Sequence, residues 1–414
     1  MNQKIYIPML DLKREYEYMK PDIDAAIARC LGHQKWILGP EVKEFEDKVA
    51  EYLCVKHCIG TSSGTDALVL ALRALAIKIK GEEYFDRSDL IITTPFTFTA
   101  TGDAILRAGA TPCFVDINPT TYNIDPSQVR EFLTQTSKIK IHNSTQAVGI
   151  LPVHLFGQSC QMDEIMSIAD EYDLFVVEDC AQAFGAKWHM ANGCWQTVGS
   201  IGDVGCFSFF PSKNLGGFGD AGAISTDDDE IADLVRVLIK HGGKDKYNVE
   251  HIGYNARIDS LQAAVLLAKL KYINDFNNRR RQIAQRYSES LLDTHDIVVP
   301  STNICSPITN LTHVFNQFTL RVLNRNRDKL RLSLKQSGTD SAIYYPVPLN
   351  KMKVFDGRAK ECNELSRSEQ IVKEVLSLPI GPLMEDVEVK SVIDAIRHFR
   401  DCRSQFTKTQ ISRI

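Results

Sequence analysis

Short apolar runs, separated by amphipathic stretches, constrain the fold of this chain most. Runs that predict buried strands occupy residues 90–93, 111–115, 147–153 and 174–177. Helical periodicity fills the intervals between them, at residues 99–108, 126–134 and 162–172. Apolar runs without polar alternation are typical of strands that are buried on both faces. The order is a βαβ series, which predicts a mostly parallel sheet with helices on both faces.

The length of 414 residues favours two domains over one. Upstream helices are predicted at 22–31 and 41–53, where Pro40 suits a helix start. A large domain is predicted for residues 1–265 and a smaller C-terminal domain for residues 266–414. The boundary falls inside one long helix expected over about 257–290. The smaller domain is expected to hold a β-type segment at 315–322 and helices near 327–337, 366–375 and 386–400.

Composition describes an ordinary globular chain, with 44% hydrophobic and 24% charged residues. A net charge of −4 gives no electrostatic footprint for nucleic acid. No apolar run has the length of a membrane span and the N-terminus lacks a signal-peptide core, so we expect a cytoplasmic protein. The 11 cysteines are expected to be reduced thiols, and the close pair Cys54 and Cys58 has no second pair to complete a zinc site. No metal site is predicted.

Residues 208–217 place Lys213 beside two hydroxyls, between an apolar run and a glycine cluster. A partly desolvated lysine loses some of its preference for the charged form, and its free amine can condense with an aldehyde. The hydroxyls and the glycine-rich backbone are suited to a phosphate. This combination is typical of a site for pyridoxal 5'-phosphate. The alternative is a solvated lysine in a glycine-rich turn.

An acidic pair, Glu178 and Asp179, follows the apolar run 174–177 directly. Ligands of open α/β sheets bind beyond the carboxyl ends of the strands, so Asp179 is a candidate partner for a protonated ring nitrogen. The alternative is that Asp179 caps the next helix.

Two further segments carry candidate cofactor contacts. Residues 61–68 open a helical pattern with small hydroxyl residues and Gly64, and a helix N-terminus of this kind favours an anion. An ordinary serine or threonine N-cap is the alternative. In residues 94–101, Phe98 is a candidate ring to stack on a planar cofactor, and a core position is its alternative.

Taken together, these motifs resemble the DegT/DnrJ/EryC1/StrS family of pyridoxal-phosphate-dependent sugar aminotransferases. The resemblance runs nearly end to end and in order. It is carried by residues 36–42, 63–68, 95–101, 114–117, 153–157, 178–182, 208–214, 253–264, 345–349 and 376–379. It implies the aspartate-aminotransferase-like α/β fold (fold type I), with a large domain on a mostly parallel sheet and a smaller C-terminal α/β domain.

The resemblance also implies a role for individual residues. Lys213 matches the Schiff-base lysine, Asp179 the partner of the pyridine nitrogen, and Gln182 a side chain against the phenolic oxygen of the cofactor. Asn255 matches an asparagine that reaches the phosphate from a neighbouring subunit, which implies a homodimer with shared sites. The remaining positions are those of phosphate contacts and of the stacking ring: Gly64, Thr65 and Ser208, and Phe98. The chain departs from the family pattern at Asn350, where histidine is frequent, and in residues 78–89 and 133–147, which are longer or more polar.

The implied function is transfer of an amino group from an amino acid, with L-glutamate favoured, to a nucleotide-linked (UDP or dTDP) 3-keto or 4-keto hexose. One alternative is a sugar dehydratase of the same fold. Its members carry histidine where this chain has Lys213, which argues against it. The other alternative is a regulator that binds the cofactor without turnover. It would need an added DNA-binding module, for which the chain has no spare residues.

Several residues stay open between two interpretations. His154 either lines the pocket or is satisfied by neighbouring backbone. Residues 241–247 either contact a diphosphate or form a solvated loop. The run 279–281 (three arginines) is expected to be a solvated helix face. Trp188 and Trp195 belong either to a hairpin on the substrate side or to ordinary packing.

Overall fold

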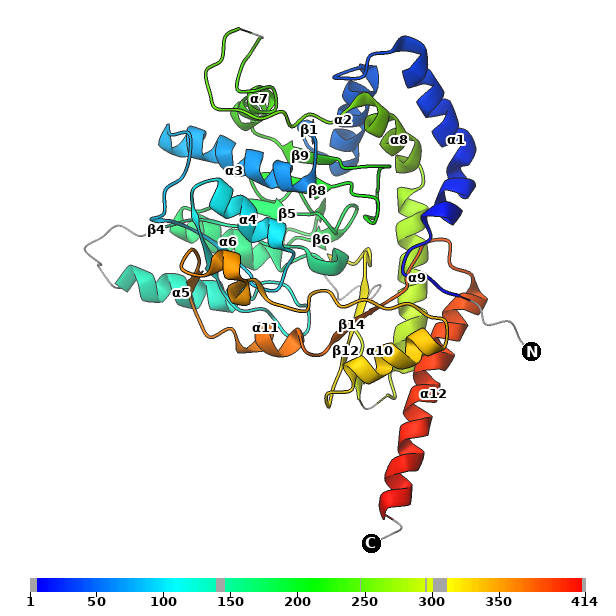
Figure 1. The fold of residues 1–414 in the computed structure, drawn as a ribbon. Helices are drawn as coiled ribbons and strands as arrows, with labels where there is room; N and C mark the ends of the chain where they lie inside the picture. The colour runs from blue at the N-terminus through cyan, green and yellow to red at the C-terminus, as the bar shows by residue number, and fades with distance from the viewer. Residues whose placement is uncertain (1–5, 139–145, 246, 295, 301–310, 412–414) are drawn as a thin grey trace.

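An eight-stranded sheet forms the centre of the molecule (Figure 1). The computed structural model describes the backbone of residues 6–138, 146–245, 247–294, 296–300 and 311–411. The strand order is β1-β9-β8-β5-β4-β2-β3-β13. The bounds are β1 His57–Thr61, β2 Asp89–Thr93, β3 Thr111–Phe114, β4 Gln146–Ile150, β5 Phe175–Asp179, β8 Val204–Ser208, β9 Gly222–Thr226 and β13 Lys360–Glu361. Only β9 is antiparallel to its neighbours, which confirms the predicted mostly parallel sheet.

Helices cover both faces of this sheet, as predicted. Successive strand residues point to opposite faces, so Val177 packs in one core and Val176 in another. The helices on the Val177 side are α3 (Gly64–Lys80), α4 (Thr99–Arg107) and α7 (Asp229–Leu238). Those on the other side are α2 (Pro40–Leu53), α5 (Pro126–Lys138), α6 (Met162–Tyr172) and α8 (Ser260–Leu270). Of the stretch 133–147, which is expected to depart from the family pattern, residues 139–145 lie outside the described residues.

The single long helix predicted over 257–290 is wrong, because two helices occupy this stretch. α8 ends at Leu270, and α9 (Ile273–Leu291) begins after two intervening residues. At the break, Tyr272 Oη donates a hydrogen bond to Asp22 Oδ2 (2.6 Å) on α1 (Leu12–His33), and Lys271 Nζ lies 3.2 Å from Asp22 Oδ1. No glycine or proline marks this position in the sequence. The break is therefore tied to tertiary contacts with α1, which the local pattern does not record.

The C-terminal region forms a second, smaller sheet from β10 (Ile297–Val298), β12 (Phe318–Val322) and β14 (Val375–Leu378). α9, α10 (Arg327–Gln336) and α12 (Asp386–Ile411) pack on it around Phe318 and Leu376. The predicted large and small α/β parts are thus confirmed. The helix predicted at 366–375 is shorter, since α11 spans Ser366–Ile371 and β14 begins at Val375.

The remaining elements are small. A three-stranded sheet joins β6 (Lys187–His189), β7 (Trp195–Thr197) and β11 (Leu311–Thr312). Single turns of 3-10 helix occupy Leu155–Gly157, Leu349–Lys351 and Lys353–Phe355. Among the described residues, none of the helices has the length and apolar character that crossing a bilayer requires.

Two cysteines far apart in the sequence, Cys113 and Cys362, are joined by a disulfide. β13 pairs in parallel with β3 and places Lys360 opposite Cys113. The two cysteine Cα atoms are therefore 6.1 Å apart, within the usual range for a disulfide. The expectation of reduced thiols is wrong for this pair, because a separation of 249 residues gives no sign of the strand pairing.

Candidate active site

The predicted site residues gather at the carboxyl ends of the central strands, where open α/β sheets bind ligands. β5 ends at Asp179, β8 ends at Ser208, and α3 begins at Gly64. A cavity of about 340 Å³ lies there. Seven of the eight predicted residues line it: Gly64, Thr65, Phe98, Asp179, Gln182, Ser208 and Lys213.

Lys213 lies in a tight loop that follows β8. Its N–H donates to Phe210 O (2.8 Å), which closes a turn around Pro211. A Cβ on Gly216 would lie 2.5 Å from Pro211 O, so the return of the loop requires glycine. The glycine cluster of the motif thus shapes the turn that carries the lysine.

The electrostatic setting of Lys213 favours a free amine. Burial lowers the pKa of Lys213, and the nearby Asp179 carboxylate offsets part of that shift. Lys213 also lines the cavity instead of projecting from a surface loop, so the solvated-lysine alternative is wrong. A neutral amine facing a cavity is what condensation with an aldehyde requires.

Asp179 is the last residue of β5 and is almost fully buried, with 4% of its surface exposed. Its Oδ1 accepts the N–H of Ala181 (3.1 Å) and its Oδ2 accepts the hydroxyl of Thr101 (2.9 Å). Burial raises the pKa of Asp179, and these donors and Lys213 oppose the rise. The chain after Asp179 forms turns and then β6, so the alternative in which Asp179 caps a following helix is wrong.

The N-terminus of α3 and the end of β8 form a narrow cradle. Ser63 caps α3, since its Oγ accepts the N–H of Asp66 (3.1 Å), as the N-cap interpretation expected. A Cβ on Gly64 would lie 2.6 Å from Ser208 Cβ, so only glycine lets the two segments approach so closely. The backbone of Gly64 and Thr65 at a helix N-terminus, with a serine hydroxyl opposite, suits a phosphate. The residues present therefore fit the phosphate end of pyridoxal phosphate.

Gln182 and Phe98 also line the cavity. Gln182 Oε1 accepts the N–H of Phe156 (2.7 Å), and its Nε2 donates to Tyr345 Oη (2.9 Å). Phe98 is 55% exposed, so its core alternative is wrong. Its ring centroid lies 6.0 Å from that of Tyr345. A planar ligand in the cavity therefore has an exposed aromatic ring available to stack on.

Asn255 is the one predicted residue that does not line the cavity. It is exposed, and its side-chain oxygen accepts a short hydrogen bond from Arg257. The next residue is tied to the site, since Ala256 O accepts the N–H of Ser62 (2.9 Å). Asn255 thus lies at the surface near the start of α3, outside the cavity of its own chain.

Some residues that line the cavity were not predicted as site residues from the sequence. Thr101, Gln317, Tyr344 and Tyr345 also line it. Thr101 had a detectable signal, because Thr97 and Thr101 are four residues apart at the start of a helix that follows a strand. Gln317 and the two tyrosines come from the C-terminal region, and no local pattern connects them with Lys213.

His154 is fully buried and does not line the cavity. Its Nδ1 accepts the N–H of Cys160 (3.0 Å), so Nε2 carries the proton and donates to Glu178 Oε2 (2.9 Å). The interpretation of a histidine satisfied within the fold is therefore confirmed, although its main partner is a carboxylate.

The two tryptophans lie in and beside the β6–β7 hairpin but not on the cavity. Trp188 is buried, and its Nε1 donates to Asp163 Oδ2 (2.9 Å). Trp195 is 48% exposed on β7. Packing describes Trp188, whereas a position of the hairpin on the substrate side stays a prediction for Trp195.

The arginine run on α9 is not a solvated face, so that expectation is wrong. Arg280 is 4% exposed and donates to Ile380 O (2.6 Å). Arg279 donates to Met384 O (2.8 Å) and forms an ion pair with Asp386. These arginines tie α9 to the residues before and at the start of α12.

The basic stretch 241–247 is only partly described, because Lys246 lies outside the described residues. Lys244 Nζ lies 3.2 Å from Glu250 Oε2, and Asp245 accepts the N–H groups of Tyr247 and Asn248. None of these residues lines the cavity of this chain. A contact with a diphosphate stays a prediction.

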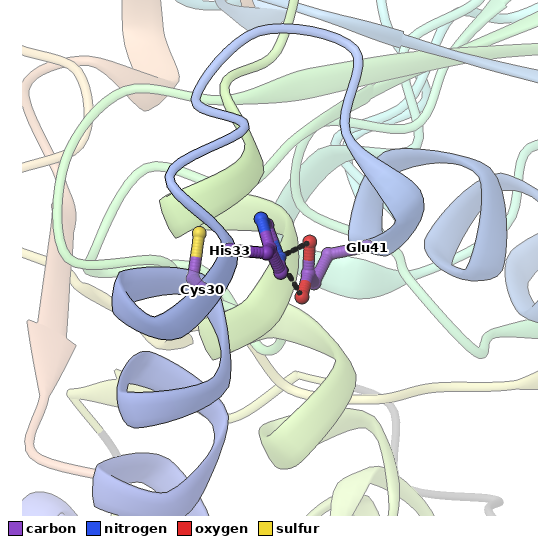
Figure 2. A group of neighbouring side chains, drawn as sticks. All are labelled: Cys30, His33 and Glu41. Carbon is purple, nitrogen blue, oxygen red and sulfur yellow. Dashed lines mark hydrogen bonds and ion pairs between the residues drawn. The ribbon is translucent and has the colours of Figure 1, made fainter.

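Two groups of His, Cys and Glu side chains among the described residues have the proximity of metal ligands. In the first, hydrogen bonds join His33 to Glu41 and none reaches Cys30 (Figure 2). His33 Nδ1 accepts the N–H of Lys35, so Nε2 carries the proton and has no lone pair for a metal. His154 in the second group is held in the same tautomer. In each group, the histidine and the glutamate form a hydrogen-bonded pair within the fold.

The fold and the site together define a class, the fold type I enzymes that hold pyridoxal phosphate on a lysine. Within it, the family model of the "DegT/DnrJ/EryC1/StrS aminotransferase family" matches residues 17–397. The chain belongs to this family, and it is a pyridoxal-phosphate-dependent aminotransferase.

Individual relatives match over nearly their whole length. A protein of Geobacillus stearothermophilus named "Pleiotropic regulatory protein" is 40% identical, covering 95% of this chain and 98% of the relative. The UDP-2-acetamido-2-deoxy-3-oxo-D-glucuronate aminotransferase of Pseudomonas aeruginosa is 37% identical, covering 94% and 99%. The crystal structure of NtdA from Bacillus subtilis, with bound cofactor PMP, superposes with a TM-score of 0.82 at 30% identity, covering 97% and 86%.

Proposed function

We propose that this aminotransferase moves the amino group of L-glutamate to the keto carbon of a nucleotide-linked hexose, with a UDP- or dTDP-linked 3-keto sugar favoured over a 4-keto sugar. The observation that carries the chemistry is the meeting of Lys213 and Asp179 in one cavity with the α3 cradle. The substrate rests on the relative from Pseudomonas aeruginosa, which is named for a UDP-linked 3-oxo sugar.

The residues that line the cavity would contact different parts of the cofactor. Gly64, Thr65 and Ser208 would hold the cofactor phosphate, and Phe98 would stack on the ring. Gln182, fixed by Phe156 and Tyr345, would contact the phenolic oxygen. When bound, pyridoxal phosphate supplies an electron sink for the carbon that loses or gains a proton.

Asp179 and Lys213 act on protons. Asp179 is held by Thr101 and Ala181 with its carboxylate at the cavity, where it would keep a ring N–H charged. Burial lowers the pKa of Lys213, which favours its neutral amine, and this amine serves as the base that removes a proton from the donor and the acid that returns it.

The shared site is part of the proposal. Asn255 is exposed and lies outside the cavity of its own chain, which suits a contact with the cofactor phosphate of a second copy. A two-fold homodimer is the simplest assembly that places the residue there. We also propose the division of the chain into residues 1–265 and 266–414, and a cytoplasmic location.

The regulator hypothesis has one observation in its favour, the name of the relative from Geobacillus stearothermophilus. The two functions differ in turnover. If the chain is an aminotransferase, adding glutamate to the protein with pyridoxal phosphate changes the absorbance spectrum of the cofactor and yields one equivalent of 2-oxoglutarate. A cofactor spectrum that glutamate leaves unchanged would favour the regulator.

The substrate is tested separately, with the glutamate-treated protein. We expect a UDP- or dTDP-linked 3-keto hexose to reverse the spectral change faster than its 4-keto isomer or a GDP-linked sugar. Reversal by the 4-keto sugars alone would overturn the favoured substrate while leaving the aminotransferase chemistry intact.

A further inference from the structure

Arg73 is the largest fully buried side chain of the described residues, in the middle of α3. A guanidinium withdrawn from water must find partners for its N–H groups. Its Nη2 donates to Glu83 Oε2 (2.6 Å) and to Ile252 O (3.0 Å), and its Nη1 donates to Tyr254 Oη (2.8 Å). Its Nε forms a further short hydrogen bond with Glu83 O. Arg73 therefore ties α3 to the segment that follows it and to residues 252–254, which are distant in sequence.

Glu83 extends the cluster from the segment between α3 and β2. Its Oε1 lies 2.8 Å from His251 Nδ1, and its Oε2 also accepts the N–H of Ile252 (3.3 Å). The next residue, Tyr84, places its ring 3.7 Å from the guanidinium of Arg73. These contacts come from residues 78–89, where this sequence is longer or more polar than the family pattern. Glu83 and Tyr84 thus join the cluster from a stretch that is expected to depart from that pattern.

Arg73 and Glu83 hold residues 251–254, and Asn255 follows this segment directly. Tyr254 N–H also donates to Leu238 O (2.7 Å), so the segment is fixed from both sides. Asn255 itself is exposed, its side-chain oxygen accepts a hydrogen bond from Arg257, and its backbone pairs with Lys240. Its position therefore depends both on this pairing and on the preceding backbone that Arg73 and Glu83 hold.

We propose that Arg73, together with Glu83, is a positioning residue for the active site of a second copy of this chain. It holds residues 251–254 so that Asn255 meets the cofactor phosphate of the partner. This inference rests on the shared site of the proposed function. The consequence that distinguishes this proposal is that a substitution of Arg73 weakens cofactor binding in the partner's site and not in the site of its own chain.

The first measurement uses Arg73→Met, which keeps an unbranched buried side chain but removes the charge and the donors. We expect its dissociation constant for pyridoxal phosphate to rise about tenfold, the size of one or two lost hydrogen bonds to a charged group. Arg107→Met is the matched control, because Arg107 is an exposed arginine on α4 that forms an ion pair with Asp103. Equal affinity in the two variants would overturn the proposal.

The second measurement separates the two sites of the dimer. Arg73→Met chains are mixed with Lys213→Ala chains and allowed to exchange subunits. In a hybrid, the site that keeps Lys213 faces a partner with intact Arg73, so its cofactor affinity should return to the wild-type value. At a pyridoxal phosphate concentration too low to fill Arg73→Met homodimers, the hybrids should add about a quarter of the wild-type activity, because random pairing at equal ratio makes half the dimers hybrids with one intact site each. If the surviving site keeps the weak affinity, Arg73 acts within its own chain and the proposal is wrong.

Two controls keep this result decisive. Glu83→Gln carries the same test if Arg73→Met does not fold, because it preserves shape and removes the negative charge that faces Arg73 and His251. A mixture of Asn255→Ala with Lys213→Ala tests the shared site itself. Rescue in that mixture without rescue in the Arg73→Met mixture overturns the positioning role alone. Failure of both mixtures, with exchange shown by mass, overturns the shared site and the positioning role together.

Discussion

The last two residues of β5 place one carboxylate on each face of the sheet, and the two faces treat them differently. Glu178 points away from the cavity and is fully buried. Its Oε1 accepts the N–H groups of Ile201 and Gly202 (both 2.8 Å), and its Oε2 accepts those of Gly199 and His154 (both 2.9 Å). Burial acts to raise the pKa of Glu178, but these donors outweigh it and the pKa lies below its usual value.

Asp179 points into the cavity and has half as many donors, the hydroxyl of Thr101 and the N–H of Ala181. Here burial prevails, and the pKa of Asp179 lies above its usual value. Two neighbouring carboxylates with similar burial thus differ in how completely the fold satisfies them. A fully satisfied buried charge stabilises structure, whereas an incompletely satisfied one at a cavity is available to a ligand.

The largest effect is expected from Lys213, which lines the same cavity as Asp179. Lys213→Ala should lower the rate of the glutamate half-reaction by at least about 10⁴-fold, because the variant lacks both the attachment point and the base. Thermal unfolding without cofactor should change little, since the side chain faces a cavity. A half-reaction within tenfold of wild type, measured by stopped-flow absorbance, would show that another group does this work.

Asp179→Asn should lower the same rate by about a hundredfold, the size typical of removing a charge aimed at a developing charge. Asparagine keeps the shape and can still accept the N–H of Ala181. An unchanged rate would mean that Asp179 and Glu178 are functionally alike, and the comparison between the two faces would fail.

Asp179→Asn should raise the stability of the cofactor-free protein, although it lowers the catalytic rate. Because the folded-state pKa of Asp179 is raised, the folded state binds more protons than the unfolded state between the two pKa values. Stability contributed by this group therefore falls as pH rises through that window, so at neutral pH the carboxyl group of Asp179 destabilises the fold. Asp179→Asn should accordingly unfold at a higher temperature than wild type at pH 7, with the difference shrinking as the pH is lowered.

The sequence predicted the parts of this site that are local. Lys213, Asp179, Gly64 and Ser208 each stand in a short motif whose chemistry is visible without neighbours, and the structure brings them to one cavity. The βαβ pattern predicted the sheet for the same reason. The family resemblance, not spacing, supplied Asn255, and its contact with a partner stays a prediction.

What the sequence could not predict depends on contacts between distant segments. The break before α9 goes with the hydrogen bond of Tyr272 to Asp22, and the disulfide of Cys362 depends on the pairing of β13 with β3. Tyr345 lies in the C-terminal region of the sequence, yet it lines the cavity and accepts a hydrogen bond from Gln182. Nothing within a window of ten or twenty residues records these contacts.

Glu178→Gln is expected to have a smaller effect, and on stability instead of catalysis. The amide replaces one oxygen by an N–H₂ group that faces donors, so at least one backbone N–H loses its acceptor inside the core. The free energy of unfolding should fall by about 2 kcal/mol. Denaturant titration of Glu178→Gln and Asp179→Asn side by side should give shifts of opposite sign at pH 7. Shifts of the same sign would show that the two faces do not differ as described.

The smallest effect is expected from Tyr345→Phe, which removes one hydroxyl from the cavity face. Gln182 Nε2 loses its acceptor at 2.9 Å, while the ring contacts with Phe98 and Phe96 remain. A single neutral hydrogen bond is worth about 1 kcal/mol, so the half-reaction should slow about fivefold because Gln182 is held less firmly. Tyr122→Phe is the matched control, since its ring also contacts Phe96 but does not line the cavity. Equal losses in the two variants would mean that the hydroxyl acts through packing, and a loss near a hundredfold would place Tyr345 beside Asp179 in the chemistry itself.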